Sequence, residues 1–276
     1  MNHERDPLAV CRRLYAKIIS IRVPGHTARV EAAFAQVPRE AFLGPPPWSI
    51  GTGDAANWHD ISEPAALYQD VLVAMNKAKG INNGQPSLHA RCISALRLRA
   101  SDDVLHVGAG AGYYTAILAR LAASVVGYEI EPDLAKRAAT NLLPWPNARI
   151  CPDTAVGRPL PPVDAIYVSA GVTAPDPHWL DALRPGGRLL FPLTGDERLG
   201  GMLLVTRRAR GFAAAILCEC GFIDCVGMRD PVTARRLTAV FRAGGAERVR
   251  SLTRSAPHGA TLWFRGDGWY LSTRPV

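Results

Sequence analysis

The sequence predicts an α/β fold with a doubly wound, mostly parallel sheet, N-terminal helices and a small C-terminal extension. From residue 103 onward, short apolar runs alternate with stretches of helical periodicity, which is the pattern of strands joined by crossover helices. The first of these runs opens the stretch "DDVLHVGAGAGYYTAILARL", residues 102–121, where three glycines separate it from a helical pattern. Open α/β sheets bind ligands at this position, just past the carboxyl end of a strand.

The elements follow one another in a regular order. Strands are expected at residues 103–108, 125–130, 147–151, 163–169 and 187–193, and helices at 112–123, 132–142 and 176–184. Residues 185–187, Pro-Gly-Gly, are expected to form a turn before the last of these strands.

The two ends of the chain have different patterns. Residues 8–36 show helical apolar spacing, and residues 37–60 are rich in proline and glycine and predict a loop that carries Trp48 and Trp58. Beyond residue 200 the pattern predicts further strands, then a basic helix near 233–243 and an aromatic tail, "TLWFRGDGWYLS". These shifts suggest a division into an N-terminal region (1–80), a core (81–225) and a C-terminal extension (226–276).

The bulk composition predicts one large soluble domain, alone or with an appendage. The chain has 276 residues, of which 48% are hydrophobic and 20% charged. No apolar run approaches the roughly 20 residues that a membrane span needs. The N-terminus is charged and lacks the apolar core of a signal peptide, so we expect a cytoplasmic protein with no membrane partner.

Charge and cysteine content narrow the possible partners. The net charge is +8, but the arginines are spread out apart from moderate clusters at 207–210 and 235–254, without interleaved aromatic residues. Nucleic acid is therefore a disfavoured partner, whereas a basic surface would attract a carboxylate-bearing substrate. The six cysteines lack the paired spacing of a zinc site, so no metal is expected.

The spacing of the glycines indicates the kind of ligand. Gly108, Gly110 and Gly112 run G-x-G-x-G, and Tyr113 stands where a dinucleotide fingerprint needs its third glycine. No Gly-Lys-Ser/Thr follows, which excludes a P-loop. Glu129 closes the next strand about twenty residues on, the spacing at which an acid accepts from ribose hydroxyls. The loop alone is equally compatible with a tight turn, but with Glu129 it predicts S-adenosylmethionine, whose adenosine carries no phosphate.

Longer segments carry a resemblance to a known family. They are "AFAQVPREAFL", "LYQDVLVAMNKAKGINNGQPSLHARCISAL", "VLHVGAGAGYYTAILARL", "VVGYEIEPDLAKRAATNL" and "VDAIYVSAGVTAPDPHWLDALRPGGRLLFPL". Over roughly residues 20–225 the chain resembles the protein-L-isoaspartate O-methyltransferases, which are S-adenosylmethionine-dependent enzymes. The resemblance implies a Rossmann-like sheet of seven strands, carboxyl O-methylation of a peptide or protein, and protein repair as the role.

The resemblance also assigns residues to the cofactor. It implies that residues 108–112 wrap the methionine part, Glu129 holds the ribose, Asp153 faces the adenine and His89 lines the pocket. The complete set expected at the cofactor is His89, His106, Gly108, Ala109, Gly110, Ala111, Gly112, Tyr113, Glu129, Ile130 and Asp153.

Two positions depart from the family pattern. His106 stands where the family has an acid, and a neutral imidazole can hydrogen-bond but supplies no fixed negative charge. The family's acceptor-side motif is Thr-x-Ser-x-Pro; aligned on Pro86, this chain has Asn82 at the threonine and Gly84 at the serine. Asn82 and Asn83 carry amide donors that could position an acceptor in place of the hydroxyl, or they form a turn before Pro86.

The expected catalytic segment is therefore Asn82, Asn83 and Gly84, and three functions stay open for it. Isoaspartyl methylation is the first, a related peptide or natural-product carboxylate the second, and a non-catalytic cofactor-binding relative the third. Nucleic-acid methylation is disfavoured, because the fourth core strand ends in "VSAGVTAP", without the D/N-P-P-Y/F motif or a Pro-Cys nucleophile. The sequence leaves the oligomeric state open.

Overall fold

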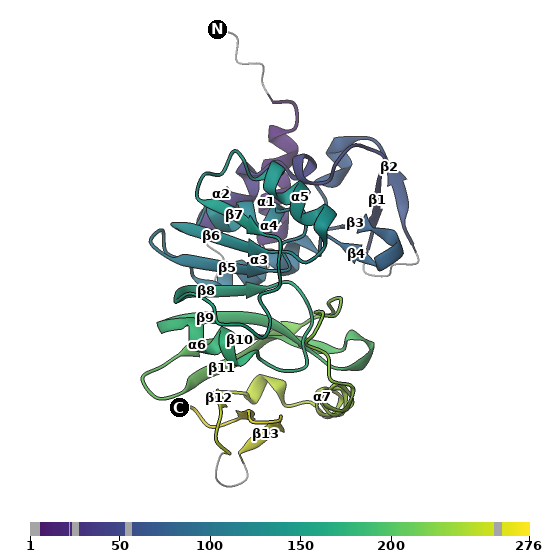
Figure 1. Ribbon diagram of the computed structural model, residues 1–276. Helices are drawn as coiled ribbons and strands as arrows, with labels where there is room; N and C mark the ends of the chain where they lie inside the picture. The colour runs from purple at the N-terminus through teal and green to yellow at the C-terminus, as the bar shows by residue number, and fades with distance from the viewer. Residues whose placement is uncertain (1–5, 22, 24–27, 53–56, 257–260) are drawn as a thin grey trace. The chain divides into compact units, whose positions relative to one another are not determined.

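The computed structural model describes residues 6–21, 23, 28–52, 57–256 and 261–276 (Figure 1). The chain divides into two compact units. The first comprises Met1–Ser101 and Ala109–Asp153, and the second comprises Asp102–Gly108 and Thr154–Val276. The chain passes between the two units after Ser101, after Gly108 within the glycine loop, and after Asp153. The three-part division expected from the sequence stays a prediction.

Helices grouped about a parallel strand pair form most of the first unit (Figure 1). The helices are α1 (Ala9–Ser20), α2 (Ala28–Gln36), α3 (Pro86–Leu96), α4 (Tyr113–Ala119) and α5 (Pro132–Asn141). The strands β6 (Ser124–Tyr128) and β7 (Ala148–Cys151) pair in parallel, as the alternating pattern predicts. Aromatic rings in edge-to-face contact fill the space between the helices, with Phe34 and Phe42 at 6.3 and 5.7 Å from Tyr113.

A small antiparallel sheet, in the order β2-β1-β3-β4, completes the first unit. Its strands are β1 (Trp48–Gly51), β2 (His59–Ile61), β3 (Leu72–Asn76) and β4 (Ile81–Asn82). The loop expected over residues 37–60 is therefore wrong in part, since it contains β1 and the start of β2. Trp48 and Val73 pack together with Leu67 in a buried cluster, and this long-range contact stabilises strands too short to show an alternating pattern.

The second unit is a sheet in the order β13-β14-β12-β11-β10-β9-β8-β5. The strands β5 (Asp103–Val107), β8 (Val163–Val168) and β9 (Leu183–Thr194) are parallel, in agreement with the sequence. The later strands pair antiparallel: β10 (Gly200–Arg207), β11 (Phe212–Glu219), β12 (Ser251–Thr253), β13 (Leu262–Arg265) and β14 (Tyr270–Ser272). Ala165 through Val168 are completely buried, which explains the continuous apolar run of β8.

The turn expected at residues 185–187 is an irregularity inside β9 instead. Gly186 has φ +77°, and the register shifts from Val163 opposite Leu183 to Ala165 opposite Arg188. The helix α6 (Pro177–Ala182) ends before this point, so the helix expected at 176–184 is shorter than its pattern suggests.

The C-terminal extension adds strands to the edge of this sheet. Helix α7 (Pro231–Ala243) confirms the basic helix, and Asp230 caps it by accepting from Thr233 N at 2.6 Å. Strand β12 then pairs with β11, with Leu252 opposite Phe212. The extension therefore continues the sheet of the second unit.

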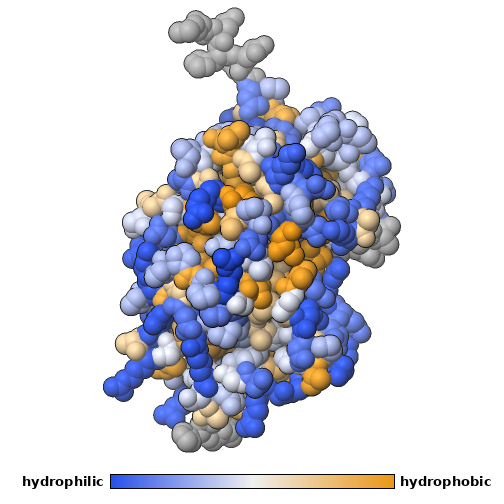
Figure 2. Space-filling model, in the orientation of Figure 1, coloured by the Kyte–Doolittle hydropathy of each residue, from blue (hydrophilic) through white to orange (hydrophobic). Residues whose placement is uncertain are grey.

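The described residues contain neither a helix that could span a membrane nor a cluster that could bind a metal ion. On the face drawn in Figure 2, hydrophobic residues form separate groups among hydrophilic ones.

Candidate functional site

The glycine loop adopts a conformation that only glycine accepts readily. Gly108, Gly110 and Gly112 have φ values of +76°, +56° and +96°. Ala109 N donates to the carbonyl of Tyr128 at 3.1 Å, which fastens the loop to the end of β6. A Cβ added at Gly110 would meet no atom within 4 Å, so the loop faces open space at this residue.

Glu129 fixes the loop from the other side. Its Oε2 accepts from Gly110 N at 2.6 Å, and its Oε1 accepts from Glu131 N at 2.9 Å. The side chain is buried, and burial raises its pKa above the ordinary value, although the backbone N–H donors partly oppose this. The carboxylate therefore joins the end of β6 to both the loop and the start of α5.

The other residues expected near the loop take different positions. Ala111 O accepts from Asn141 Nδ2 at 2.9 Å. The side chain of Tyr113 is buried in the aromatic core, with its hydroxyl 3.4 Å from that of Tyr15, so only its backbone adjoins the loop. Ile130 and Asp153 are exposed at the ends of β6 and β7, on the ligand-binding edge of parallel strands.

His106 lies in the second unit, on β5, and is completely buried. Its Nε2 is 3.0 Å from Ser169 Oγ, and its ring stacks on Tyr167 at 5.4 Å. Burial lowers the pKa of His106 to about 3. The imidazole is therefore neutral at physiological pH and supplies no charge at this position. Its contact with a cofactor stays a prediction.

The expected catalytic segment lies in the first unit and is held by its own amides. Asn82 Oδ1 accepts from Gly84 N at 2.9 Å, which forms the turn before Pro86. Asn83 Oδ1 accepts from Val73 N at 2.8 Å, whereas its Nδ2 is buried with no partner among the described residues. The carbonyl groups of both amides are thus structural, and the Nδ2 of Asn83 is a buried donor without a partner among the described residues.

A buried arginine that the sequence gave no reason to single out organises this segment. Arg39 is completely buried, and its guanidinium donates to the carbonyls of Leu67 and Val71 at 2.6 Å each and to Asn83 Oδ1 at 3.4 Å. It also donates to Gln69 O at 3.0 Å. One cation therefore fixes the chain that leads into β3 together with the amide of Asn83.

The helix that follows begins at a fixed point. The carboxylate of Asp70 accepts from Ser87 N at 2.8 Å and from Ser87 Oγ at 2.6 Å, and Gln85 Nε2 donates to it at 2.9 Å. A carboxylate at a helix N-terminus is favourable for its free N–H groups and its dipole. Asp70 therefore fixes the first turn of α3, which carries His89.

Gly84 and His89 depend on each other. The His89 ring is buried and stacks on Tyr114, with centroids 3.6 Å apart and an interplanar angle of 5°. Gly84 has φ +74°, and a Cβ added there would lie 2.1 Å from His89 Nε2. No side chain fits at residue 84 while the imidazole holds this place. In this structure the position therefore admits glycine alone, and the stacking partner Tyr114 has no signal in the sequence.

Comparison with known sequences identifies relatives for most of the chain. Residues 17–230 match the family described as protein-L-isoaspartate(D-aspartate) O-methyltransferase. A protein-L-isoaspartate O-methyltransferase 2 from Anaeromyxobacter sp. is 34% identical over 188 residues, which are 66% of this chain and 70% of that protein. A protein-L-isoaspartate O-methyltransferase from Rhodopseudomonas palustris is 33% identical over 207 residues, which are 73% of this chain and 87% of that protein.

Solved structures share the fold. A protein-L-isoaspartate O-methyltransferase aligns with a TM-score of 0.64 at 24% identity, and the alignment covers 78% of this chain and 66% of that one, just under two thirds of its length. A putative protein-L-isoaspartate O-methyltransferase from Plasmodium falciparum, in complex with S-adenosyl-L-homocysteine, aligns with a TM-score of 0.61 at 19% identity and covers 77% and 97% of the two chains. Both confirm the α/β methyltransferase fold.

The contact between Gly84 and His89 predicts a coupled stability effect. Gly84→Ala is expected to lower the free energy of unfolding by about 2–4 kcal/mol, because a positive φ costs an L-residue about 1–2 kcal/mol and the imidazole must also move. Gly110→Ala is the matched control, since φ is positive there but the space is open. Urea unfolding measures both, and equal losses for the two variants would refute the steric coupling.

Burial of His106 predicts a dependence of stability on pH. Its pKa in the folded protein lies below that of the unfolded chain, so the unfolded state binds the extra proton and stability is lost as pH falls below about 6.5. Between pH 6.5 and 5 the wild type is expected to lose about 1–2 kcal/mol more than His106→Gln, in which the titrating ring is absent. Urea unfolding at the two pH values measures this loss. An equal loss of unfolding free energy in the wild type and in His106→Gln would contradict the assignment.

Proposed function

The chain belongs to the protein-L-isoaspartate(D-aspartate) O-methyltransferase family, and from that premise we propose that it methylates a carboxylate of a peptide or protein. It is an S-adenosylmethionine-dependent O-methyltransferase. The names of its relatives make the isoaspartyl carboxylate the first acceptor to consider. Protein repair as the role and the cytoplasm as the location belong to the proposal as well.

The observation that carries the proposal is the arrangement of Glu129 and Gly110. S-adenosylmethionine needs an acceptor for its ribose hydroxyls and a backbone that its methionine part can approach. Glu129 presents a buried carboxylate directly at the loop, and the Cα of Gly110 borders open space. The residues present therefore fit this cofactor, with Glu129 to hold the ribose and residues 109–112 to border the methionine part. Asp153 and Ile130, at the same ends of parallel strands, are proposed to face the adenine side.

The chemistry makes modest demands on the protein. When bound, S-adenosylmethionine supplies an activated methyl group on a sulfonium. A carboxylate acceptor has an ordinary pKa near ~4, so it is ionised at neutral pH and needs no strong general base. The protein's contribution is alignment of the reactants and exclusion of water, which can lower a barrier by on the order of 7–11 kcal/mol.

The acceptor side is proposed to lie at Asn82, Asn83 and Gly84. Arg39 donates to Asn83 Oδ1 and so polarises the amide, which strengthens its Nδ2 as a donor to an anion. The positive charge of Arg39 also favours a nearby carboxylate over a neutral acceptor. Loss of the family serine costs a positioning hydrogen bond, worth about 1–3 kcal/mol, and removes no nucleophile.

Gly84 favours a second candidate, a carboxylate acceptor other than isoaspartate. With no hydroxyl at residue 84 and the His89 ring beside it, the acceptor side differs in shape and in donors from a serine-containing motif. An aspartyl side chain or the carboxylate of a modified peptide is the alternative of this class.

Transfer of labelled methyl from S-adenosylmethionine to two matched peptides tests the proposal. One peptide carries isoaspartate and the other aspartate at the same position. Base-labile label on the isoaspartyl peptide alone is the expected result, and label on the aspartyl peptide would support the second candidate. No transfer to either, with cofactor binding confirmed by titration, would refute carboxyl methylation of these acceptors.

Removal of the charge of Glu129 tests the cofactor site separately. Glu129→Gln is expected to weaken S-adenosylhomocysteine binding about 10- to 100-fold, because charge-assisted hydrogen bonds contribute about 1.5–3 kcal/mol. Glu131→Gln is the matched control, since that side chain is engaged with Lys79 at 2.5 Å. Calorimetric titration measures both, and equal affinities for the two variants would contradict the assignment of Glu129 to the ribose.

A further inference from the structure

An ion pair joins the β3–β4 hairpin, which leads into the proposed acceptor segment, to the cofactor edge of the first unit. Lys79 Nζ donates to Glu131 Oε2 at 2.5 Å, across 52 positions of the sequence. The side chain of Glu131 is 25% exposed and that of Lys79 is 55% exposed. Both residues belong to the first unit, so the pair connects two parts of one compact body.

The carboxylate end of this pair is fixed at the cofactor edge. Glu131 stands at the N-terminus of α5, where the free N–H groups and the helix dipole favour an acid. Its backbone N–H donates to Glu129 Oε1 at 2.9 Å, and the other oxygen of Glu129 accepts from Gly110 N. The acid that binds Lys79 is thus two residues from the acid proposed to hold the ribose.

The lysine end is fixed just before the acceptor segment. Lys79 is the last residue of the short helix η3 (Lys77–Lys79), and its backbone N–H donates to Asn76 Oδ1 at 3.2 Å. Gly80, with φ +65°, ends this helix and leads directly into β4. Because Lys79 lies three residues before Asn82, a fixed ammonium group limits the positions that the acceptor segment can take.

Strand β4 has few contacts of its own to hold it. It contains two residues, lies at the edge of the small sheet, and its register against β3 is irregular. A strand this short at an edge is held by few hydrogen bonds and opens locally at low cost. Asn83 follows it directly and donates from its backbone to Val73 O at 3.0 Å. Separation of β4 would therefore release the acceptor segment from β3 as well.

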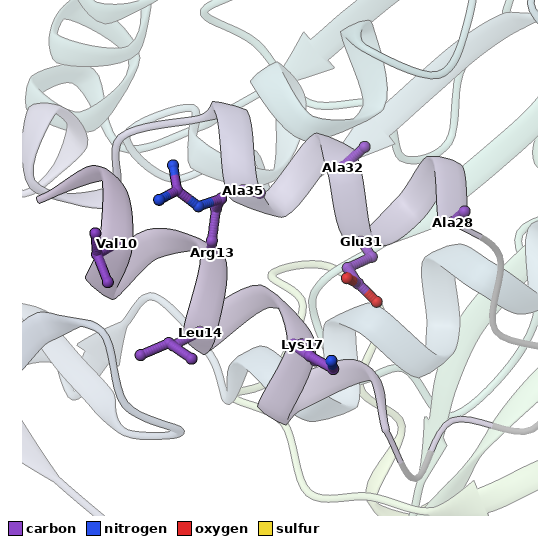
Figure 3. Close-up of a pocket in the computed structure, with 8 residues that line it drawn as sticks. All are labelled: Val10, Arg13, Leu14, Lys17, Ala28, Glu31, Ala32 and Ala35. Carbon is purple, nitrogen blue, oxygen red and sulfur yellow. The ribbon is translucent and has the colours of Figure 1, made fainter.

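A lysine beside a glutamate does not position a segment in every setting. In the groove of about 340 Å³ between α1 and α2, Lys17 lies beside Glu31 (Figure 3). These two helices are already packed through buried rings, with Tyr15 and Phe34 in edge-to-face contact at 6.3 Å. The hairpin differs, because η3 has no buried residue and both residues of β4 are partly exposed.

We propose that the ion pair of Lys79 and Glu131 is a clasp that holds β4 on the edge of the sheet and so positions the acceptor segment, residues 82–84. Both are then positioning residues and touch neither substrate. This role rests on the proposed function, because residues 82–84 form the acceptor side only there. A partly exposed ion pair is weak, so its loss shifts the hairpin from ordered to detached by about two- to fivefold.

Lys79→Met tests the clasp through the methyl acceptor. At saturating S-adenosylmethionine, KM for the peptide that accepts the methyl group should rise about two- to fivefold, because the peptide binds only the ordered hairpin. The value of kcat should stay unchanged, since bound peptide keeps the hairpin ordered. A variant that merely loses folded protein would lower kcat instead.

Lys77→Met is the matched control for this measurement. That lysine lies on the same short helix, but its partner Asp60, at 3.3 Å, belongs to the small sheet itself. It therefore makes no connection to the cofactor edge. Equal KM values for Lys79→Met and Lys77→Met would overturn the proposal.

Glu131→Gln identifies the partner of the lysine. It should raise KM by the same factor as Lys79→Met, and the two changes together should have no larger effect than either alone, because both remove one interaction. Lys79→Arg keeps the charge and should keep the wild-type KM. Affinity for S-adenosylhomocysteine should stay at the wild-type value in all of these variants. Additive effects, or a fall in that affinity, would contradict a clasp that acts on the acceptor side.

Amide hydrogen exchange tests the clasp without any substrate. In the ligand-free protein, the N–H of Asn83 should exchange about two- to fivefold faster in Lys79→Met than in Lys77→Met, because its bond to Val73 O opens with β4. Failure of the wild type to methylate either peptide would refute the proposed function, and the exchange rates alone would then decide on the clasp. Equal exchange in the two variants would overturn it.

Discussion

A single buried carboxylate, that of Glu129, fixes the geometry on which the ligand side of the first unit depends. It accepts from Gly110 N in the loop and from Glu131 N before α5, and together with the hydrogen bond from Ala109 N to Tyr128 O it joins the loop to the end of β6 and the start of α5. The glycines allow the loop to adopt positive φ values, and the carboxylate selects one of the conformations that they allow. Burial raises the pKa of this carboxyl, so the ionised form depends on its N–H donors and, in the proposed complex, on ribose hydroxyls.

The acceptor side depends on a different pair of constraints. Arg39 fastens the chain before β3 to Asn83, and His89 occupies the space that a side chain at residue 84 would need. In this chain Gly84, the imidazole of His89 and the stacked ring of Tyr114 fit together, so a side chain at residue 84 would require the imidazole to move. The segment before α3 is ordered without a hydroxyl at residue 84, because Asn82, Asn83 and Asp70 accept backbone N–H groups in and around it.

The sequence predicts those features that local chemistry determines. The loop, Glu129 and the parallel strands follow from glycine spacing, an acid in register and buried apolar runs, and α7 was expected as a basic helix near residues 233–243. Strands β1 and β2 were missed because their few residues depend on contacts with Leu67 and Val73 far along the chain. The inward direction of Tyr113, the burial of Arg39 and the stacking of His89 on Tyr114 likewise arise from tertiary packing, which one sequence does not display.

The structure of the protein with S-adenosylhomocysteine bound tests the central claim most directly. The account predicts that both ribose hydroxyls lie within hydrogen-bonding distance of the Glu129 carboxylate, and that the amino-acid part of the ligand passes against Gly110. It also predicts that the His89 ring keeps its place beside Gly84. A ligand bound away from Glu129, or a loop that closes the space at Gly110 when the ligand is present, would contradict the account.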